Sequence, residues 1–304
     1  MKKKSSLLLL LCAFTFCFAQ EKTTYTNERG DLHLCGPFEI NELKEDSLYA
    51  AWFNKRYDEF TLEGKNYSWS NKLKDIEVEI YLGTWCGDSK KWVPSFVKVW
   101  DQLGLDRENL NFTALYDTDE HYKQGPNGEE KGKQIHRVPT FIFKRGGEEI
   151  ARIVEEPQND LLTDIGQIAL GLPSQPNYKA ANYLMNLLEE KSVEEVRADI
   201  NTYFYKTYDY LGKSGELNTL GSVFLHSDRI EEAVLVFEFN FYFFRYDPYI
   251  IGSYAKALAQ LGDAKKAEEL YERALKIDPE NKWVKKLYEE LKEKAAELKE
   301  PTFE

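Results

Sequence analysis

The stretch TWCGDSKKWVP, residues 84–94, contains a cysteine whose thiol could act as a nucleophile. The thiolate is the attacking species in thiol–disulfide exchange, so the ionisation of Cys86 decides its chemistry. A strand pattern precedes Cys86 and an amphipathic helix pattern follows it, which predicts a thiol at a helix N-terminus. The dipole and free N–H groups there favour the thiolate, and such sites can lower a cysteine pKa from ~8.5 to roughly 3.5–7.5. A reactive thiol is predicted, and a buried structural cysteine is the alternative.

The elements that would position Cys86 follow from the periodicity of apolar residues. In DIEVEIYLG, residues 75–83, every second residue is apolar, which is the period of a strand. Residues 92–103 then carry apolar side chains at helical spacing, and residues 108–117 read as a second strand. Residues 136–154 read as two strands around a Gly-Gly turn, and 160–171 as a helix. The order is therefore strand, helix, strand, hairpin and helix.

Several of these motifs together resemble the thioredoxin superfamily. They are Trp85-Cys86-Gly87 at a helix start, Pro94 eight residues after the cysteine, Val138-Pro139-Thr140 before a strand, and the turn FKRGGEE at 143–149. The resemblance implies an α/β thioredoxin-like domain over residues 70–172, with a central sheet flanked by helices. It also implies that Pro139 is cis and faces Cys86, and that the Val138 backbone can pair with an extended substrate.

The chain departs from the family pattern at three positions. Ser89 stands where the second cysteine of the dithiol motif would be, so the site is a monothiol and no neighbouring thiol can resolve a mixed disulfide. The Ser89 hydroxyl can still donate a hydrogen bond to the thiolate. Asp88 replaces a common proline; its carboxylate suits a helix N-terminus but disfavours a nearby thiolate. Ile80 stands where many members carry a buried acid, which removes the usual proton relay.

Cys86 is thus the predicted catalytic residue, and the resemblance implies a set of substrate-binding residues around it. The set is Trp85, Gly87, Asp88, Ser89, Val138 and Pro139. Trp85 would cover the cysteine, support substrate or pack partly into the core. His136 or Arg137 could supply positive charge near the thiol, or both could face solvent. No metal and no cofactor are expected, because His33 and Cys35 make only one ligand-like pair.

The second half of the chain reads as an all-α domain. LPSQPNYK, residues 172–179, is the first linker-like stretch, and SVEE at 192–195 resembles a capping box. A self-match at 34 residues aligns Leu220-Gly221 with Tyr254-Ala255 and Phe237 with Tyr271. This period and pattern resemble the tetratricopeptide repeat, so residues 178–299 are interpreted as a tetratricopeptide-repeat-like domain that binds a protein partner. The aromatic run FEFNFYFFRY at 237–246 is either repeat core or a contact surface.

Residues 1–19 have the pattern of a secretory signal peptide, with three lysines followed by an apolar run too short to span a bilayer. A retained anchor or a lipid-modified cysteine is the alternative. Removal of residues 1–19 takes the formal net charge from −12 to −15, because three lysines and no acid are lost. Such an acidic chain is a poor nucleic-acid binder. No later segment is apolar enough to span a membrane, so the mature protein is expected in the bacterial periplasm or cell envelope.

Residues 20–69 are left as an N-terminal extension, with a short helix over 50–60. Cys35 in this segment is interpreted as a small buried residue, and whether it pairs with Cys86 is open.

Two functions of different classes follow from this reading. The first is thiol–disulfide oxidoreductase activity, in which Cys86 forms mixed disulfides with envelope proteins or small thiols. The second is an adaptor that binds partners through the repeats and keeps only a relic thioredoxin fold. A peroxidase of the same superfamily is disfavoured, because Thr84 stands two residues before Cys86 rather than in the arrangement that such enzymes need.

Overall fold

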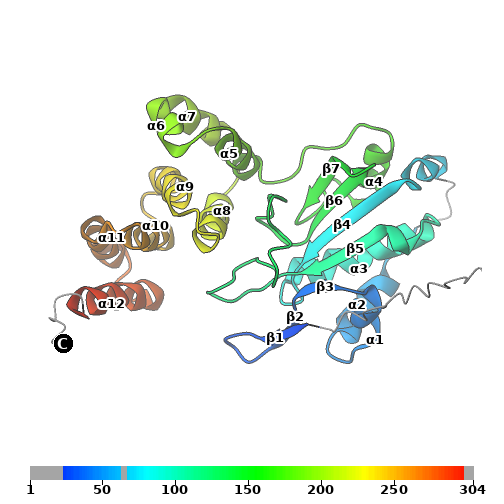
Figure 1. Ribbon diagram of the computed structural model, residues 1–304, viewed down its shortest axis with the longest axis horizontal. Coiled ribbons are helices and arrows are strands. Elements are labelled where there is room, and N and C mark those ends of the chain that lie inside the picture. Colours follow the sequence, from blue (N-terminus) through cyan, green and yellow to red (C-terminus); the bar gives the residue numbers. More distant parts are fainter. Residues whose placement is uncertain (1–22, 63–66, 298–304) are drawn as a thin grey trace, which may run out of the picture.

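The computed structural model describes residues 23–62 and 67–297, which form an α/β domain and a helical domain (Figure 1). The predicted signal peptide, residues 1–19, lies outside the described residues. The two domains are joined by the extended residues 172–177 between helices α4 (Leu161–Ala169) and α5 (Lys179–Glu190). The expected fold class, a thioredoxin-like α/β domain followed by tetratricopeptide-like helices, is confirmed.

The α/β domain is built on a five-stranded mixed sheet. Its strand order is β3-β5-β4-β6-β7, with bounds Gly36–Phe38 (β3), Leu110–Ala114 (β5), Ile76–Leu82 (β4), Thr140–Arg145 (β6) and Glu148–Val154 (β7). Strands β4 and β5 are parallel and are connected through helix α3 (Gly87–Gln102), whereas the other neighbours are antiparallel. Short 3-10 helices at Ser68–Leu73 and Arg107–Asn109 precede β4 and β5. The predicted strands and the hairpin between β6 and β7 are therefore present.

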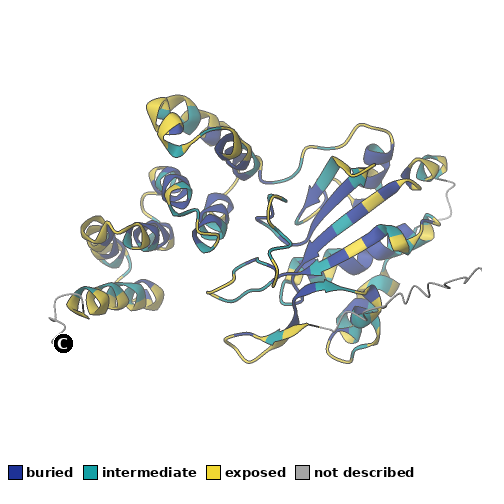
Figure 2. Cartoon of the chain, in the orientation of Figure 1, coloured by how far each residue is buried: buried dark blue, intermediate teal, exposed yellow. Residues whose placement is uncertain are grey.

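Helices cover one face of this sheet. The apolar alternation of β4 directs Ile76, Val78 and Ile80 into a core shared with helices α2 (Ala50–Glu59), α3 and α4. Figure 2 shows the central strands largely buried, with exposed positions interspersed. The opposite face of β4 carries Glu79, which forms ion pairs with Lys133 and Lys144 at 2.8 Å each. The resemblance implied a central sheet flanked by helices; in the described chain the connection from β5 to β6, over the other face, is a turn-rich loop. Its sequence, rich in glycine and charge, disfavours a helix there.

The N-terminal segment contributes to the same domain. Strands β1 (Thr24–Thr26) and β2 (Leu32–Leu34) form a hairpin, and β3 then joins the edge of the main sheet beside β5. Helices α1 (Ile40–Glu45) and α2 bury Leu43 and Phe53 in the sheet's core. The helix predicted over 50–60 is confirmed by α2. The described part of residues 20–69, read from sequence as an extension, thus supplies an edge strand and two core helices.

The helical domain consists of antiparallel helix pairs that stack on one another. Its helices are α5, α6 (Val193–Ala198), α7 (Ile200–Tyr210), α8 (Ser214–His226), α9 (Ile230–Phe243), α10 (Pro248–Leu261), α11 (Ala264–Ile277) and α12 (Lys282–Glu297). The pairs α8–α9 and α10–α11 match the two copies of the 34-residue repeat. The capping box predicted at SVEE is confirmed, because Ser192 and Glu195 bond each other's backbone N–H at the start of α6. In the aromatic run, Phe237, Phe239 and Phe241 are core, whereas Tyr242 and Tyr246 are exposed.

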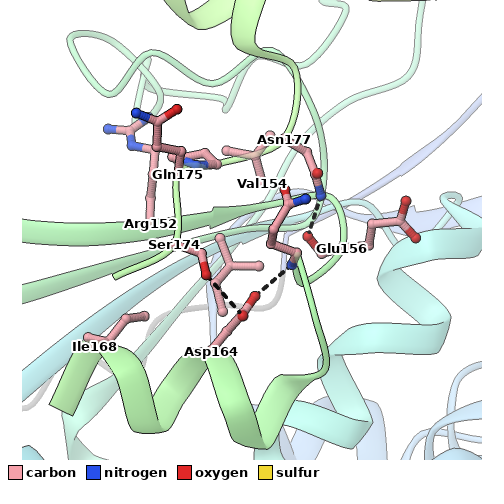
Figure 3. Close-up of a pocket in the computed structure, with 11 residues that line it drawn as sticks. Arg152, Val154, Glu156, Asp164, Ile168, Ser174, Gln175 and Asn177 are labelled. Atoms are coloured by element: carbon pink, nitrogen blue, oxygen red, sulfur yellow. Dashed lines mark hydrogen bonds between the residues drawn. The ribbon is translucent and has the colours of Figure 1, made fainter. Parts of the chain in front are cut away.

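The linker is fastened to the α/β domain by polar contacts around a small pocket (Figure 3). The buried carboxylate of Asp164 accepts hydrogen bonds from the Gln158 N–H at 2.6 Å and from the Ser174 hydroxyl at 3.4 Å. The Asn177 amide donates to the Glu156 carbonyl oxygen at 2.8 Å. These bonds give the buried polar groups partners and hold the start of the helical domain near strand β7. Within the described ranges, no helix is long and apolar enough to cross a membrane.

Candidate functional site

Cys86 lies at the turn between the end of β4 and the start of α3. It is the N-cap residue of the helix, with extended backbone angles (φ −83°, ψ 128°). Its N–H donates to the Gly83 carbonyl oxygen at 2.9 Å, and its own carbonyl oxygen accepts from the Lys90 N–H at 3.0 Å. The side chain is half-buried rather than enclosed. The predicted position at a helix N-terminus is confirmed, and the sulfur is placed where the first-turn N–H groups have no intrahelical partner.

The loop before strand β6 faces Cys86. The peptide bond between Val138 and Pro139 is cis, as expected from the family resemblance. The Cys86 thiol donates a hydrogen bond to the Val138 carbonyl oxygen over 3.2 Å. The sequence distance between Cys86 and Val138 is large, so this contact depends on the pairing of β4 with β6. The bond uses the thiol proton, and it is therefore lost when the sulfur ionises.

Trp85 is held in place beside the cysteine. Its indole N–H donates to the Leu115 carbonyl oxygen at 2.7 Å, and its ring lies so close to the Gly83 backbone that a side chain at position 83 would collide with it. The ring also packs against a small apolar cluster that contains Tyr81 and Val138. Of the three interpretations of Trp85, partial core packing is the one that these contacts describe, and the residue is only half-buried beside Cys86.

The next residues of the turn differ in their accessibility. Gly87 is exposed and Asp88 is half-buried in the first turn of α3. Ser89 is fully buried, and its hydroxyl oxygen accepts a hydrogen bond from the Gly83 N–H at 3.2 Å. In the described part of the chain, no hydrogen bond joins Ser89 to Cys86. Ser89 therefore links the first turn of α3 to the residue after strand β4. The predicted hydrogen bond from its hydroxyl to the Cys86 sulfur is absent from this arrangement.

The second cysteine does not pair with the first. Cys35 and Cys86 are both free thiols, and Cys35 is buried beside the Tyr116 hydroxyl, with which it hydrogen-bonds. Burial raises the pKa of the Cys35 thiol. A neutral, enclosed thiol is a poor nucleophile, so the interpretation of Cys35 as a small buried residue is confirmed.

The N-terminal hairpin supports the same turn. Thr84, two residues before Cys86, accepts from the Leu34 N–H at 3.2 Å and contacts Nδ1 of His33 at the same distance. Sequence reasoning missed this contact, because residues 33 and 84 are brought together only by the packing of the hairpin. No cluster of three or more His, Cys, Asp or Glu suited to a metal ion occurs in residues 23–62 and 67–297.

Charged groups from three segments gather behind the cis-proline loop. Lys123, in the loop between β5 and β6, is buried and donates from Nζ to the His136 carbonyl oxygen at 2.8 Å. Burial lowers the pKa of Lys123 to about 7. Arg137 forms an ion pair with Glu155 at 3.2 Å, and the Glu155 N–H donates to the Pro139 carbonyl oxygen at 2.7 Å. Burial raises the pKa of the Glu155 carboxyl, although the Arg137 guanidinium opposes this.

His136 and Arg137 had two interpretations, as sources of positive charge or as solvent-facing residues. His136 is buried, neither ring nitrogen has a hydrogen-bond partner in the described chain, and burial lowers the pKa of its imidazole well below the ordinary range. It is therefore neutral near pH 7. Arg137 is only partly accessible and pairs with Glu155. Neither residue faces solvent freely, and the cation that sequence reasoning missed is Lys123.

The helical domain reaches the same loop. Arg137 donates from Nη2 to the Gly215 carbonyl oxygen in the first turn of α8 at 2.7 Å, and its guanidinium lies 4.5 Å from the ring centroid of Tyr178. On the other side of the interface, the Gln124 amide donates to the His226 carbonyl oxygen at the end of α8. The two domains thus meet at the loops that surround Cys86, and Figure 1 shows α8 on the side of the α/β domain where these loops lie.

Comparisons with known proteins agree with this division. A family model described as tetratricopeptide repeat matches residues 252–291, which span most of α10, all of α11 and the first part of α12. Thioredoxin H9 of Arabidopsis thaliana is 28% identical over 115 residues, which are 36% of this chain and 75% of that relative. No solved structure matches.

Proposed function

We propose that this chain, a thioredoxin-like domain followed by tetratricopeptide repeats, performs thiol–disulfide exchange through the single thiol of Cys86. The observation that carries the proposal is the contact between the Cys86 sulfur, at the N-terminus of α3, and the carbonyl oxygen of Val138 in the cis-proline loop. Cys86 is half-buried, whereas Cys35 is buried, so Cys86 is the thiol proposed to meet a client.

The chemistry follows from one thiolate without an internal partner. The Cys86 thiolate attacks one sulfur of a client disulfide; the S–S bond of the client breaks, a new S–S bond to Cys86 forms, and the other client sulfur leaves as a thiolate. Ser89 cannot resolve this mixed disulfide and Cys35 is buried. A second thiolate must therefore come from outside, either from a small thiol or from another cysteine of the client. Its attack frees Cys86 and transfers the S–S bond to the incoming sulfur.

The client is proposed to be a protein or a small disulfide of an oxidising compartment. Export is supported by the signal-peptide pattern of residues 1–19, and the periplasm or cell envelope is the compartment where disulfides persist. The repeat match supports a protein partner for the helical domain, because stacked repeats present extended surfaces to other chains.

Oxidised glutathione provides a direct test of the proposal. We expect the wild type and Cys35→Ala to gain one glutathione on the peptide that contains Cys86, and reduced glutathione to remove it. Cys86→Ala should gain none. An adduct on Cys35, or no adduct on a demonstrably free Cys86, would contradict the proposed chemistry.

An adaptor that needs no reactive thiol is the second candidate, and the tetratricopeptide match favours it. The two functions differ in how partners are held. If wild type and Cys86→Ala retain the same partners and no disulfide-linked species is lost from the variant, the adaptor function is supported. If the partners of the wild type are released by reductant and absent from Cys86→Ala, thiol exchange is supported.

A further inference from the structure

Lys123 is a buried lysine in a loop, and only 4% of its surface is exposed. Its backbone has positive φ (57°), and its N–H donates to the Tyr116 carbonyl oxygen at 2.9 Å. The side chain runs over the ring of Tyr122, with Nζ 4.7 Å from the ring centroid, and ends at the His136 carbonyl oxygen. The ammonium is therefore directed beneath the cis-proline loop.

No carboxylate lies within ion-pair distance of Nζ in the part of the chain that the structure describes. One carbonyl oxygen satisfies only one of the three donors of an ammonium group. A buried cation without a counter-ion carries a large desolvation cost, so such a residue is expected to be neutral or to have a partner that becomes negative. Burial lowers the pKa of Lys123 to about 7, which leaves both forms populated near neutral pH.

The groups that act on Lys123 identify this partner. The Arg137 guanidinium lowers its pKa, and the negative forms of Cys86 and Glu155 raise it. Tyr122 supplies a ring face and His136 is neutral, so neither provides a negative charge. Glu155 is already paired with Arg137 at 3.2 Å. The Cys86 sulfur bonds the Val138 carbonyl oxygen, two residues after the carbonyl that binds Nζ, so both side chains end at the cis-proline loop. Among the described residues that act on Lys123, Cys86 is the group that can become an anion and has no ion-pair partner.

We infer that Lys123 is a positioning residue for Cys86: its buried ammonium stabilises the thiolate from beneath the cis-proline loop. The inference rests on the proposed function, because only a reactive thiol needs a counter-charge. In the resting protein the Cys86 thiol donates to Val138, and on ionisation this bond is lost. The Lys123 charge then offsets the loss, since an opposite charge nearby favours the ionised form.

The test is the rate of iodoacetamide alkylation of Cys86 in the full chain as a function of pH, read by mass spectrometry of the Cys86 peptide. For Lys123→Met we expect the pH of half-maximal rate to rise by about one unit and the rate at pH 7 to fall about tenfold. Lys123→Arg should retain most of the wild-type rate. Lys131→Met is the matched control, because Lys131 is in the same loop but exposed, and it should leave the profile unchanged.

The outcomes separate this inference from the proposed function. A wild type that reacts fast at pH 7 together with an equally fast Lys123→Met overturns only the role of Lys123. A wild-type Cys86 that reacts no faster than free cysteine overturns the proposed function and this inference with it. A pH profile that shifts as expected supports both the proposed function and the role of Lys123. A lysine with a purely structural role in the loop would change how much of the variant folds, but not the pH profile of the folded fraction.

A second measurement does not depend on the folding of Lys123→Met. With ¹³C at the lysine ε-carbons, the titration midpoint of Lys123 can be compared between wild type and Cys86→Ala. Coupling between two sites is reciprocal, so loss of the thiolate should lower the midpoint of Lys123 by as much as loss of the ammonium raises that of Cys86. Equal midpoints in the two proteins would overturn the inference.

Discussion

Arg137 donates a hydrogen bond from Nη2 to the carbonyl oxygen of Gly215 over 2.7 Å, so the loop that faces Cys86 is bonded directly to the helical domain. The same guanidinium pairs with Glu155 and lies against the ring of Tyr178. One side chain therefore contacts the residue after strand β7, the N-cap residue of α5 and helix α8. The orientation of the repeats relative to Cys86 depends on this residue, because charged hydrogen bonds of this kind contribute about 1.5–3 kcal/mol each.

Arg137→Ala should loosen the contact between the domains. We expect cleavage of the linker, residues 172–177, by a nonspecific protease to become about tenfold faster, which corresponds to ~1.4 kcal/mol of lost docking. Arg145→Ala is the control, since Arg145 pairs with Asp75 at the far end of β6 and touches neither Tyr178 nor Gly215. Equal cleavage of wild type and Arg137→Ala would show that other contacts hold the domains together.

Glu216 is a buried carboxylate that completes the start of helix α5 from the neighbouring helix α8. It accepts from the Ala180 N–H at 2.8 Å, the Ala181 N–H at 3.1 Å and the Gly212 N–H at 3.1 Å. Tyr178, the N-cap residue of α5, makes no side-chain cap of its own. Glu216→Ala leaves the buried N–H groups of Ala180 and Ala181 unsatisfied and should reduce the free energy of unfolding of the helical domain by about 2–4 kcal/mol.

Glu216→Gln retains an acceptor oxygen and should lose clearly less stability than Glu216→Ala. Exposed Glu269 in helix α11 provides the control, and Glu269→Ala should change the unfolding free energy by less than about 0.5 kcal/mol. The measurement is urea unfolding followed by the helical signal. If Glu216→Ala proves as stable as Glu269→Ala, Glu216 does not cap α5.

The features that were predictable from sequence are those encoded by neighbouring residues. The alternation in 75–83 gave strand β4, the periodicity after Cys86 gave α3, and Val138-Pro139 gave the cis loop through a family resemblance. These signals are local, since they depend on period and on short motifs. They place the thiol, the turn and the loop correctly.

The missing part of the site depends on tertiary contacts. Lys123 lies in a polar loop whose sequence, DTDEHYKQGPNGEEKGKQ, reads as surface, yet its side chain is buried by the cis-proline loop. Glu216 and Arg137 are likewise charged residues in exposed-looking segments, and each acquires its role only when α8 packs against its neighbours. Strand β3 was not predicted because three residues, Gly36–Phe38, carry too short a pattern.

Gly221, which aligns with Ala255 in the 34-residue self-match, lies where α8 contacts α9. A Cβ at this position would lie 2.7 Å from the ring of Phe237, which is itself 1% exposed and cannot move aside. Gly221→Ala should therefore destabilise the helical domain by about 1–3 kcal/mol, despite the better helix propensity of alanine. Gly215 lies in the same helix with its nearest neighbour at 4.0 Å, so Gly215→Ala should be neutral or slightly stabilising. Similar unfolding midpoints for both variants would contradict the close α8–α9 contact.

Lys123 should also make the stability of the α/β domain depend on pH. Its pKa falls from 10.5 for the ordinary side chain to about 7 in the folded protein. Between these values the unfolded chain binds more protons than the folded one, so stability rises with pH across this window and is lowest below pH 7. Lys123→Met has no such group and should be more stable than the wild type at pH 7.

The difference in unfolding free energy between Lys123→Met and wild type should shrink by about 2 kcal/mol from pH 7 to pH 9, since one unit of pKa corresponds to ~1.36 kcal/mol. Taking the difference cancels the other titrating groups, and exposed Lys131→Met should give a difference near zero at both pH values. In a Cys86→Ala background, the free energy of unfolding should rise more steeply with pH from 7 to 9, because no thiolate is present to favour the Lys123 ammonium. A difference between Lys123→Met and wild type that is constant from pH 7 to 9 would mean that Lys123 stays protonated in the folded protein, with a counter-charge that compensates its burial fully.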